Sequence, residues 1–184
     1  MIPTGYMAKK VAMRPDWLKA DAVEDIYSVS NCTSKDFCDY INYWKHNGYW
    51  FFNSPEVIQS LAEEQDIDLS GTTMFYYEVY EKQCANDTPE WTEVRPDTSF
   101  TTDVKPPTEK FLAGFDVVSF AAGTNPECSY LSCNHMAETI PVNQHCLFRT
   151  FDDAKRVLDE CAFKNCEPGP CRIFAVYITL GQRV

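Results

Sequence analysis

Hydrophobic positions in the first half of the chain alternate between the two-residue period of strands and the wider period of helices. Val57, Ile58 and Leu61 recur at helical spacing after Ser54-Pro55-Glu56, which combines a capping hydroxyl, a proline and an acid as helix starts often do. The pattern also predicts strands at 25–29, 49–52 and 72–81 and a helix at 34–46. The predicted order of this half is therefore β-α-β-α-β.

The second half has the same predicted order. Thr150 is followed three residues later by Asp153, as in a capping box, and it precedes an apolar stripe that includes Ala154 and Val157. Further strands are predicted at 115–120, 146–148 and 172–179, and a helix at 130–139. The sequence thus predicts an α+β fold class with two related β-α-β-α-β halves.

Short sequence matches between these halves suggest an internal pseudo-duplication. At an offset of 96, residues 51–54 fall on residues 147–150, and Cys32 falls on Cys128. The opening strands match when Asp25 is placed on Asp116, and the closing strands when Val79 is placed on Val176. We therefore expect the loops at Cys32 and Cys128 to be spatial counterparts, and any pocket to lie where the halves meet.

Proline and polar residues divide the chain into segments. Residues 83–110 contain four prolines and show little periodicity, so they are expected to form a Pro-rich connector. Residues 1–10 are expected to be a mobile N-terminus. The predicted organisation is one compact domain with a first half at 11–82, the connector at 83–110 and a second half at 111–184.

The charge of the chain restricts its partners. A formal net charge of −11 over 184 residues argues against direct binding to nucleic acid or anionic membranes, because both require clustered Lys and Arg. No apolar run approaches the roughly 18–20 residues of a membrane helix. The first residues also lack the apolar segment of a signal peptide. These features predict a cytoplasmic protein with neither a membrane nor a nucleic-acid partner.

Nine cysteines provide candidate chemistry. Reduced thiols are expected in the cytoplasm, where disulfides are rare. Four of them could converge from both halves on one zinc ion, although their spacing is looser than that of usual zinc ligands: Cys32, Cys38, Cys128 and Cys133. The alternative is that these thiols are simply buried in helix packing. No cofactor is expected, and a structural zinc protein is kept as an alternative hypothesis.

A thiol nucleophile would require a base within hydrogen-bond reach. Cys128 or Cys133 could act with His135 or His145, and Glu78 is a carboxylate in an aromatic strand whose acidity could be perturbed. The chain has no glycine-rich phosphate-binding motif. A small thiol-dependent enzyme, or a ligand-binding protein with its pocket between the halves, is therefore a second alternative.

Aromatic residues make up 14% of the chain and are concentrated at 40–52. Exposed Tyr and Trp favour protein binding, and nearby acids would steer a basic partner. The candidate binding residues are Tyr40, Tyr43, Tyr49, Trp50, Glu63, Glu64, Asp66 and Asp68. Our primary hypothesis is a non-catalytic acidic interaction protein, of the inhibitor or immunity type, that binds another protein of basic character. A homodimer formed through the same surface or a strand edge is also open.

Overall fold

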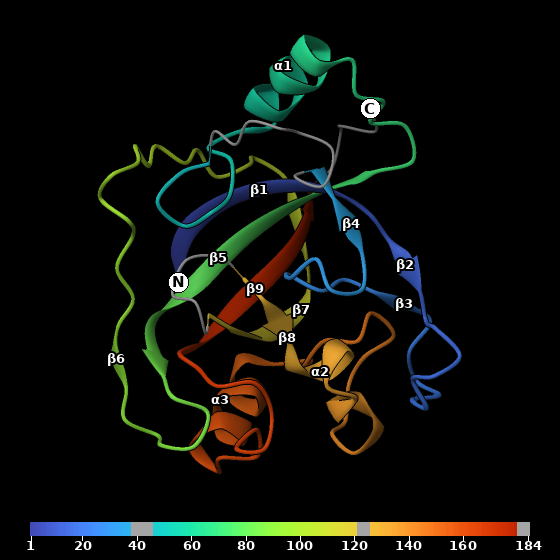
Figure 1. The fold of residues 1–184 in the computed structure, drawn as a ribbon, viewed down its shortest axis with the longest axis vertical. Helices are drawn as coiled ribbons and strands as arrows, with labels where there is room; N and C mark the ends of the chain where they lie inside the picture. Colours follow the sequence, from blue (N-terminus) through green and yellow to red (C-terminus); the bar gives the residue numbers. More distant parts are fainter. Residues whose placement is uncertain (38–45, 121–125, 180–184) are drawn as a thin grey trace.

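The computed structural model describes residues 1–37, 46–120 and 126–179. In these residues a curled antiparallel sheet combines with three α-helices, which is an α+β fold (Figure 1). The sheet curls into half a barrel. Helix α1 (Pro55–Gln65) lies at one end, and α2 (Tyr130–Cys133) and α3 (Phe151–Asp159) lie at the other. No helix in the described ranges is long and apolar enough to cross a membrane.

Four long strands lie side by side at the centre of the sheet, in the order β1, β5, β9 and β7. Short strands β4 and β8 flank β1 and β7, and β6 pairs with β5. Their bounds are β1 (Ile2–Lys10), β4 (Lys35–Asp36), β5 (Thr73–Cys84), β6 (Thr92–Glu93), β7 (Lys110–Ser119), β8 (Cys128–Ser129) and β9 (Cys171–Thr179). Strands β2 (Ala12–Met13) and β3 (Asp25–Ile26) form a separate pair.

Both faces of the central strands are covered. On β5 the consecutive residues Phe75, Tyr76 and Tyr77 are all buried, although neighbouring side chains point to opposite faces. One apolar cluster packs beneath α1 around Phe52 and Ile58, and the other lies by α2 and α3. Burial on both faces explains why β5 and β9 have continuous apolar and aromatic sequences rather than alternating ones.

The predicted mobile N-terminus is wrong. Residues Ile2–Lys10 form β1, which pairs with β5 from Ile2 opposite Val79 to Lys9 opposite Thr73. Pro3 and Gly5 resemble strand breakers in the sequence, but Gly5 lies at a β-bulge with φ 131°, a conformation that glycine adopts readily. The first half therefore begins at β1 and not at residue 11.

The other predicted elements have mixed outcomes. Helices α1 and α3 and strands β5, β7 and β9 are confirmed, and Thr150 caps α3 by accepting a hydrogen bond from the backbone N–H of Asp153 at 3.1 Å. The predicted strands at 49–52 and 146–148 are instead turns, each closed by a single bridge to a long strand. The predicted helix at 34–46 is wrong at its start, where β4 lies, and its residues 38–45 are outside the described ranges. The predicted strand at 25–29 is reduced to β3, because the chain then turns into a loop.

Two regions of the sheet have the same pairing pattern. Gly5 is opposite Tyr77 at the β1 bulge, and Gly114 is opposite Val176 at the β7 bulge. Seven successive pairs of β1 with β5, from Ile2–Val79 to Lys9–Thr73, match seven pairs of β7 with β9, from Phe111–Ile178 to Val118–Arg172. Strand β7 therefore corresponds to β1 in pairing, and the expected match of Asp25 with Asp116 is wrong because Asp25 lies in β3. The expected match of Val79 with Val176 is displaced by two residues.

The turns that face these bulges are also alike. The side-chain amide of Asn47 donates to the Thr4 carbonyl at 2.9 Å, and that of Asn143 donates to the Ala113 carbonyl at 2.7 Å. Each backbone N–H of these asparagines donates to the carbonyl four residues later, at 2.7 and 2.9 Å. Each turn then leads into a helix. Asn47 and Asn143 are 96 residues apart, which is the offset at which the sequence aligned residues 51–54 with residues 147–150.

Candidate functional site

Three thiols from both halves of the chain meet at one place. The Sγ atoms of Cys32, Cys128 and Cys133 all lie within 4.8 Å of one another. Cys32 is exposed on the loop between β3 and β4, Cys128 is buried at the start of β8, and Cys133 is half-buried at the end of α2. Within the described ranges, no other group of three or more His, Cys, Asp or Glu side chains converges in this way. We refer to these three residues as the thiol cluster.

A buried lysine fixes the loop that leads to Cys32. The Nζ atom of Lys9, on β1, donates to the carbonyls of Ser28, Val29 and Ser30 at 2.7, 2.9 and 2.7 Å. The Lys9 side chain is only 1% exposed, so these three bonds satisfy all the donors of an ammonium group removed from water. The loop at 28–30 is therefore held firmly to the sheet, two residues before Cys32.

A buried carboxylate holds the same loop from the other side. The Oδ2 atom of Asp116, on β7, accepts hydrogen bonds from the Val29 N–H at 2.9 Å and from the Ser129 hydroxyl at 2.5 Å. The Ser129 and Ser28 hydroxyls are 2.8 Å apart, and the Ser129 N–H donates to the Ser30 hydroxyl at 3.2 Å. This serine network joins the two halves directly beside the thiol cluster. Burial of Asp116 raises its pKa to about 6, although these hydrogen bonds oppose the shift.

The contacts of the three sulfur atoms differ. Cys128 donates its S–H to Asn134 Oδ1 at 3.1 Å, and Cys32 donates to the Glu127 carbonyl at 2.8 Å. Outside the cluster, the Cys133 sulfur has long contacts, at 3.8 Å to the Ser30 hydroxyl and 3.9 Å to the Ser132 hydroxyl. Cys133 therefore has the longest hydrogen-bond contacts of the three with groups outside the cluster.

These contacts separate the acidities of the three thiols. Hydrogen bonds from the Cys128 and Cys133 thiols lower the pKa of Cys32, and the positive charge of Lys9 adds to this effect. Hydrogen bonding with Cys133 and Cys32 raises the pKa of Cys128, and burial adds to this effect. A hydrogen bond from Cys128 lowers the pKa of Cys133, but its bond to Cys32 and burial raise the net value to about 11. Cys32 is thus the first of the three to ionise.

The cluster contains three of the four thiols that the sequence suggested as zinc ligands, and Cys38 lies outside the described residues. The prediction that Cys32 and Cys128 are spatial counterparts is wrong, because they do not occupy equivalent places. Cys128 is opposite Ser119 on β7, and the corresponding pair on β1 is Lys10 with Lys35. The two cysteines meet because their loops cross the boundary between the halves.

The suggested catalytic partners of these cysteines have other contacts. The His135 ring packs against that of Trp17 in a tilted arrangement with centroids 4.7 Å apart, and its Nδ1 is 3.3 Å from a Glu138 carboxylate oxygen. Glu78 forms a 2.5 Å ion pair with Lys110 and accepts hydrogen bonds from two tyrosine hydroxyls. Among the described residues, no hydrogen bond joins His135 or Glu78 to Cys128 or Cys133.

Only part of the expected aromatic surface lies in the described residues. Tyr40 and Tyr43 lie outside the described residues. Tyr49 is 6% exposed and belongs to the core, and Trp50 is half-buried and stacks on His46 at 3.8 Å. The predicted acidic positions Glu63, Glu64, Asp66 and Asp68 are all exposed. The acidic part of the predicted surface is thus present on α1 and the residues that follow it, whereas Tyr49 faces inward.

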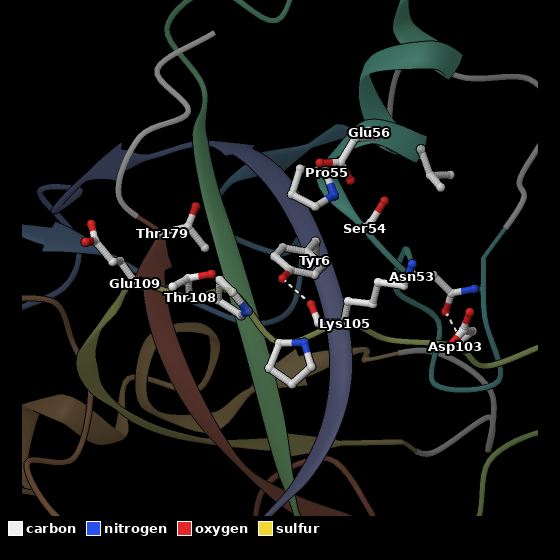
Figure 2. Close-up of a pocket in the computed structure, with 13 residues that line it drawn as sticks. Tyr6, Asn53, Ser54, Pro55, Glu56, Asp103, Lys105, Thr108, Glu109 and Thr179 are labelled. Carbon is white, nitrogen blue, oxygen red and sulfur yellow. Dashed lines mark hydrogen bonds between the residues drawn. The ribbon is translucent and has the colours of Figure 1, made fainter.

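A cavity of about 850 Å³ lies apart from the thiol cluster (Figure 2). Its walls are the start of α1 and the segment at 103–109, with Tyr6 and Thr179 contributed by the sheet. Figure 2 shows the Tyr6 hydroxyl directed at the Lys105 carbonyl, to which it donates at 2.6 Å. The cavity lies against the segment predicted as a connector, and its three acids, Glu56, Asp103 and Glu109, do not belong to a convergent group of ionisable side chains in the described residues.

Sequence reasoning missed the polar residues that build the thiol cluster. Lys9 was assigned to a mobile segment, Asp116 was treated only as the start of a strand, and the serines carry no motif. The sequence contains one weak signal for these residues, which is a charged residue within an apolar strand, such as Asp116 before Val117 and Val118. Comparison with protein-family models, curated proteins and solved structures found no match.

Proposed function

We propose that this chain is a metal-binding protein in which Cys32, Cys128 and Cys133 hold one thiophilic ion, with zinc as the first candidate. The observation that carries the proposal is the convergence of three sulfur atoms within 4.8 Å. Thiolates are the soft ligands that zinc and copper(I) prefer in proteins. Because the ligands come from both halves, the bound ion would join them.

The spacing of the thiols supports this chemistry. With zinc–sulfur bonds of about 2.3 Å, tetrahedral ligand atoms are about 3.8 Å apart. Separations of no more than 4.8 Å therefore need to close by about 1 Å at most. The exposed loop of Cys32 can supply this movement, while Cys128 is fixed by β8. Three ligands would leave one position for water or an added ligand, as in catalytic zinc sites.

The charges near the cluster also support a cation bound by thiolates. Three thiolates with one divalent ion have a net charge of −1, which is costly to hold beside an apolar core. The ammonium of Lys9 favours the ionised form of Cys32, and it is fixed in place by its three carbonyl bonds. The site thus combines soft ligands with a compensating positive charge.

Cobalt(II) and zinc titration of the reduced, metal-free protein tests this proposal. One cobalt ion per chain should give thiolate-to-cobalt absorption in the near ultraviolet, and zinc should abolish it. Cys128→Ser should weaken zinc binding about 100-fold, since each ligand supplies a sizeable share of the roughly 10–16 kcal/mol of a structural site. Cys166→Ser is the control, because Cys166 is a half-buried thiol outside the cluster. No stoichiometric binding, or equal affinity in both variants, would refute the proposal.

We also infer that the two halves are copies of one structural unit, each made of a long strand, a short flanking strand, an asparagine turn, a helix and a second long strand. The matched pairings and the two asparagine turns support this inference. The thiol cluster would then be a feature of only one end, since Lys35 and Asp36 take the places of Cys128 and Ser129.

Equivalent glycines provide a test of this inference. A Cβ atom on Gly5 would lie 2.4 Å from the Phe52 carbonyl oxygen, and one on Gly114 would lie 2.7 Å from that of Phe148. Both glycines also have positive φ, at 131° and 152°. Gly5→Ala and Gly114→Ala should each lower the free energy of unfolding by at least about 2 kcal/mol. A large loss in one variant and none in the other would contradict equivalence.

A second candidate function is the recognition of a basic protein by the acidic end of α1. Glu63 and Glu64 lie in its last turn, Asp66 caps it, and no basic residue is present there. Acids at a helix C-terminus are unfavourable by about 0.3–1 kcal/mol each, so stability does not account for them. A cavity of about 470 Å³ beside them includes the apolar residues Ala62, Ile67 and Leu69. The proposed partner surface is therefore basic with an apolar centre.

Charge reversal tests this second candidate. A variant with lysine at Glu63, Glu64, Asp66 and Asp68 should bind a lysine-rich peptide at low salt much more weakly than the wild type does. Lysine at Glu81, Asp87, Glu90 and Glu93, which are exposed elsewhere, is the control with the same change in net charge. Equal losses in both variants would show that only net charge matters and would remove this surface from consideration.

A further inference from the structure

The thiol cluster presents one sulfur to solvent and keeps two behind it. Cys32 is exposed, whereas Cys128 is buried and Cys133 is half-buried. All three sulfurs are within 4.8 Å of one another, so an oxidised Cys32 would have two thiols at close range. This arrangement of an accessible thiol with neighbouring thiols is the one that reversible cysteine oxidation requires.

We propose that Cys32 is a site of oxidation by hydroperoxides and that Cys133 resolves the oxidised form into a Cys32–Cys133 disulfide. The exposure of Cys32 gives a small oxidant access to its sulfur. The thiolate is the reactive species, and the Cys128 and Cys133 thiols, which can donate to it, lie within 4.8 Å of its sulfur. The Glu127 carbonyl holds the protonated form, so ionisation of Cys32 also requires this contact to open.

The chemistry proceeds in two steps. The Cys32 thiolate attacks one oxygen of hydrogen peroxide, the O–O bond breaks, and hydroxide leaves, so that Cys32 becomes a sulfenic acid. The Cys133 sulfur then attacks the Cys32 sulfur, the S–O bond breaks, and the departing hydroxide takes the Cys133 proton to form water. Both sulfurs are oxidised by one electron each, and the peroxide is reduced to two water molecules after proton uptake.

The contacts of the two inner thiols favour Cys133 as the resolving residue. Cys128 lies in β8, where it is paired with Ser119, and its S–H donates to Asn134 at 3.1 Å. Cys133 ends the four-residue helix α2, and its sulfur has no contact closer than 3.8 Å to the Ser30 and Ser132 hydroxyls. Cys133 can therefore approach Cys32 without breaking a strand pair.

The consequence for the metal rests on the proposed function. A Cys32–Cys133 disulfide removes two of the three thiolate ligands, and a single remaining thiolate cannot retain zinc at physiological concentrations. Oxidation would thus release the ion and leave Cys128 to regain a proton. Bound zinc would in turn slow oxidation, because it occupies the sulfur lone pairs that attack peroxide.

Peptide mapping of the metal-free, reduced protein after treatment with hydrogen peroxide tests the oxidation itself. We expect a Cys32–Cys133 disulfide that forms at least about tenfold faster than any oxidation of Cys166, whose pKa is raised by burial. In Cys133→Ser, the sulfenic acid on Cys32 should persist and react with dimedone, and Cys32→Ser should abolish both products. Cys166→Ser should match the wild type. Oxidation of all thiols at similar rates, or a disulfide with Cys128 instead, would overturn the proposal.

A parallel experiment on zinc-loaded protein separates this inference from the proposed function. Zinc release, followed with a colorimetric chelator, should keep pace with disulfide formation. A protein that forms the disulfide but never binds zinc would refute the metal proposal and leave the oxidation intact. A protein that binds zinc but forms no disulfide in its metal-free state would refute the oxidation and leave the metal site intact.

Discussion

The thiol cluster and the pair Cys84–Cys171 place cysteines close together in opposite environments. Cys84 and Cys171 are directly opposite each other on β5 and β9, and they are 2% and 0% exposed. Burial raises the pKa of Cys84 to about 12 and that of Cys171 to about 11. In the thiol cluster, by contrast, the three thiols stand at the ends of short elements and on a loop, beside a lysine and a serine network.

This difference shows that proximity alone does not make thiols reactive. The strand pair fixes Cys84 and Cys171 inside an apolar cluster, where burial outweighs the charge of Lys155 near Cys84. At the thiol cluster, the positive charge of Lys9 and hydrogen bonds from the neighbouring thiols favour a thiolate, and Cys32 reaches solvent. The local structure around each cysteine therefore decides whether its thiol is reactive.

Thiol labelling should show the largest difference between the thiol cluster and the pair Cys84–Cys171. At pH 7, Cys32 should react with iodoacetamide at least about 1,000-fold faster than Cys84 or Cys171, because a thiol with a pKa of 11 or higher is ionised to only about one part in 10⁴. Time-resolved alkylation with mass spectrometry measures the three rates. In urea the rates should converge, and comparable rates in the folded protein would contradict the comparison.

Removal of Lys9 should destabilise the loop that leads to the thiol cluster. Lys9→Met leaves the carbonyls of residues 28–30 without their buried donor, so we expect the free energy of unfolding to fall by roughly 4 kcal/mol. Lys82→Met, at an exposed position two residues from Cys84, should change it by no more than about 0.5 kcal/mol. Urea denaturation measures both, and a loss below about 1 kcal/mol in Lys9→Met would mean that the lysine does not hold the loop.

The pH dependence of stability should carry the signature of Asp116. Its pKa in the folded protein is about 6, above its ordinary value of 3.8, so between these pH values the folded state binds a proton that the unfolded state has released. The free energy of unfolding should therefore fall by up to about 3 kcal/mol as the pH rises from about 4 to about 6. Asp116→Asn should remove this decrease. Denaturation curves of both proteins across this range provide the measurement, and parallel pH profiles would contradict the assignment.

The smallest effect is expected from removing a single hydroxyl, either beside the thiol cluster or beside the pair Cys84–Cys171. Ser30→Ala removes a contact of Cys133 and should weaken zinc binding about tenfold, as removal of groups that orient metal ligands does. Tyr130→Phe removes the hydroxyl that lies 3.1 Å from the Cys171 sulfur, and it should leave zinc affinity unchanged. Competition with a chelator of known affinity measures both variants, and equal affinities would show that Ser30 does not orient the ligand.

Elements with short-range signals could be predicted from the sequence. Ser54-Pro55 and Thr150 mark the starts of α1 and α3, and the aromatic and β-branched run at 72–81 marks β5. Strand β1 was missed because Pro3 and Gly5 normally interrupt strands, and only the pairing with β5 turns Gly5 into a bulge. The similarity of the segments at 51–54 and 147–150 could be detected in the sequence. The match of β1 with β7 could be detected only from the pairing register of the sheet.

The helix starts, the strands β5, β7 and β9, the acidic charge and the group of cysteines from which the cluster is drawn follow from the sequence alone. Only the tertiary structure decided which thiols meet, because Cys32 and Cys128 belong to different halves and are joined through contacts with β1 and β7. Capping and periodicity act over a few residues and leave a local pattern. A buried lysine and a buried aspartate that position a loop across the sheet leave none, since their roles depend on partners far away in the chain.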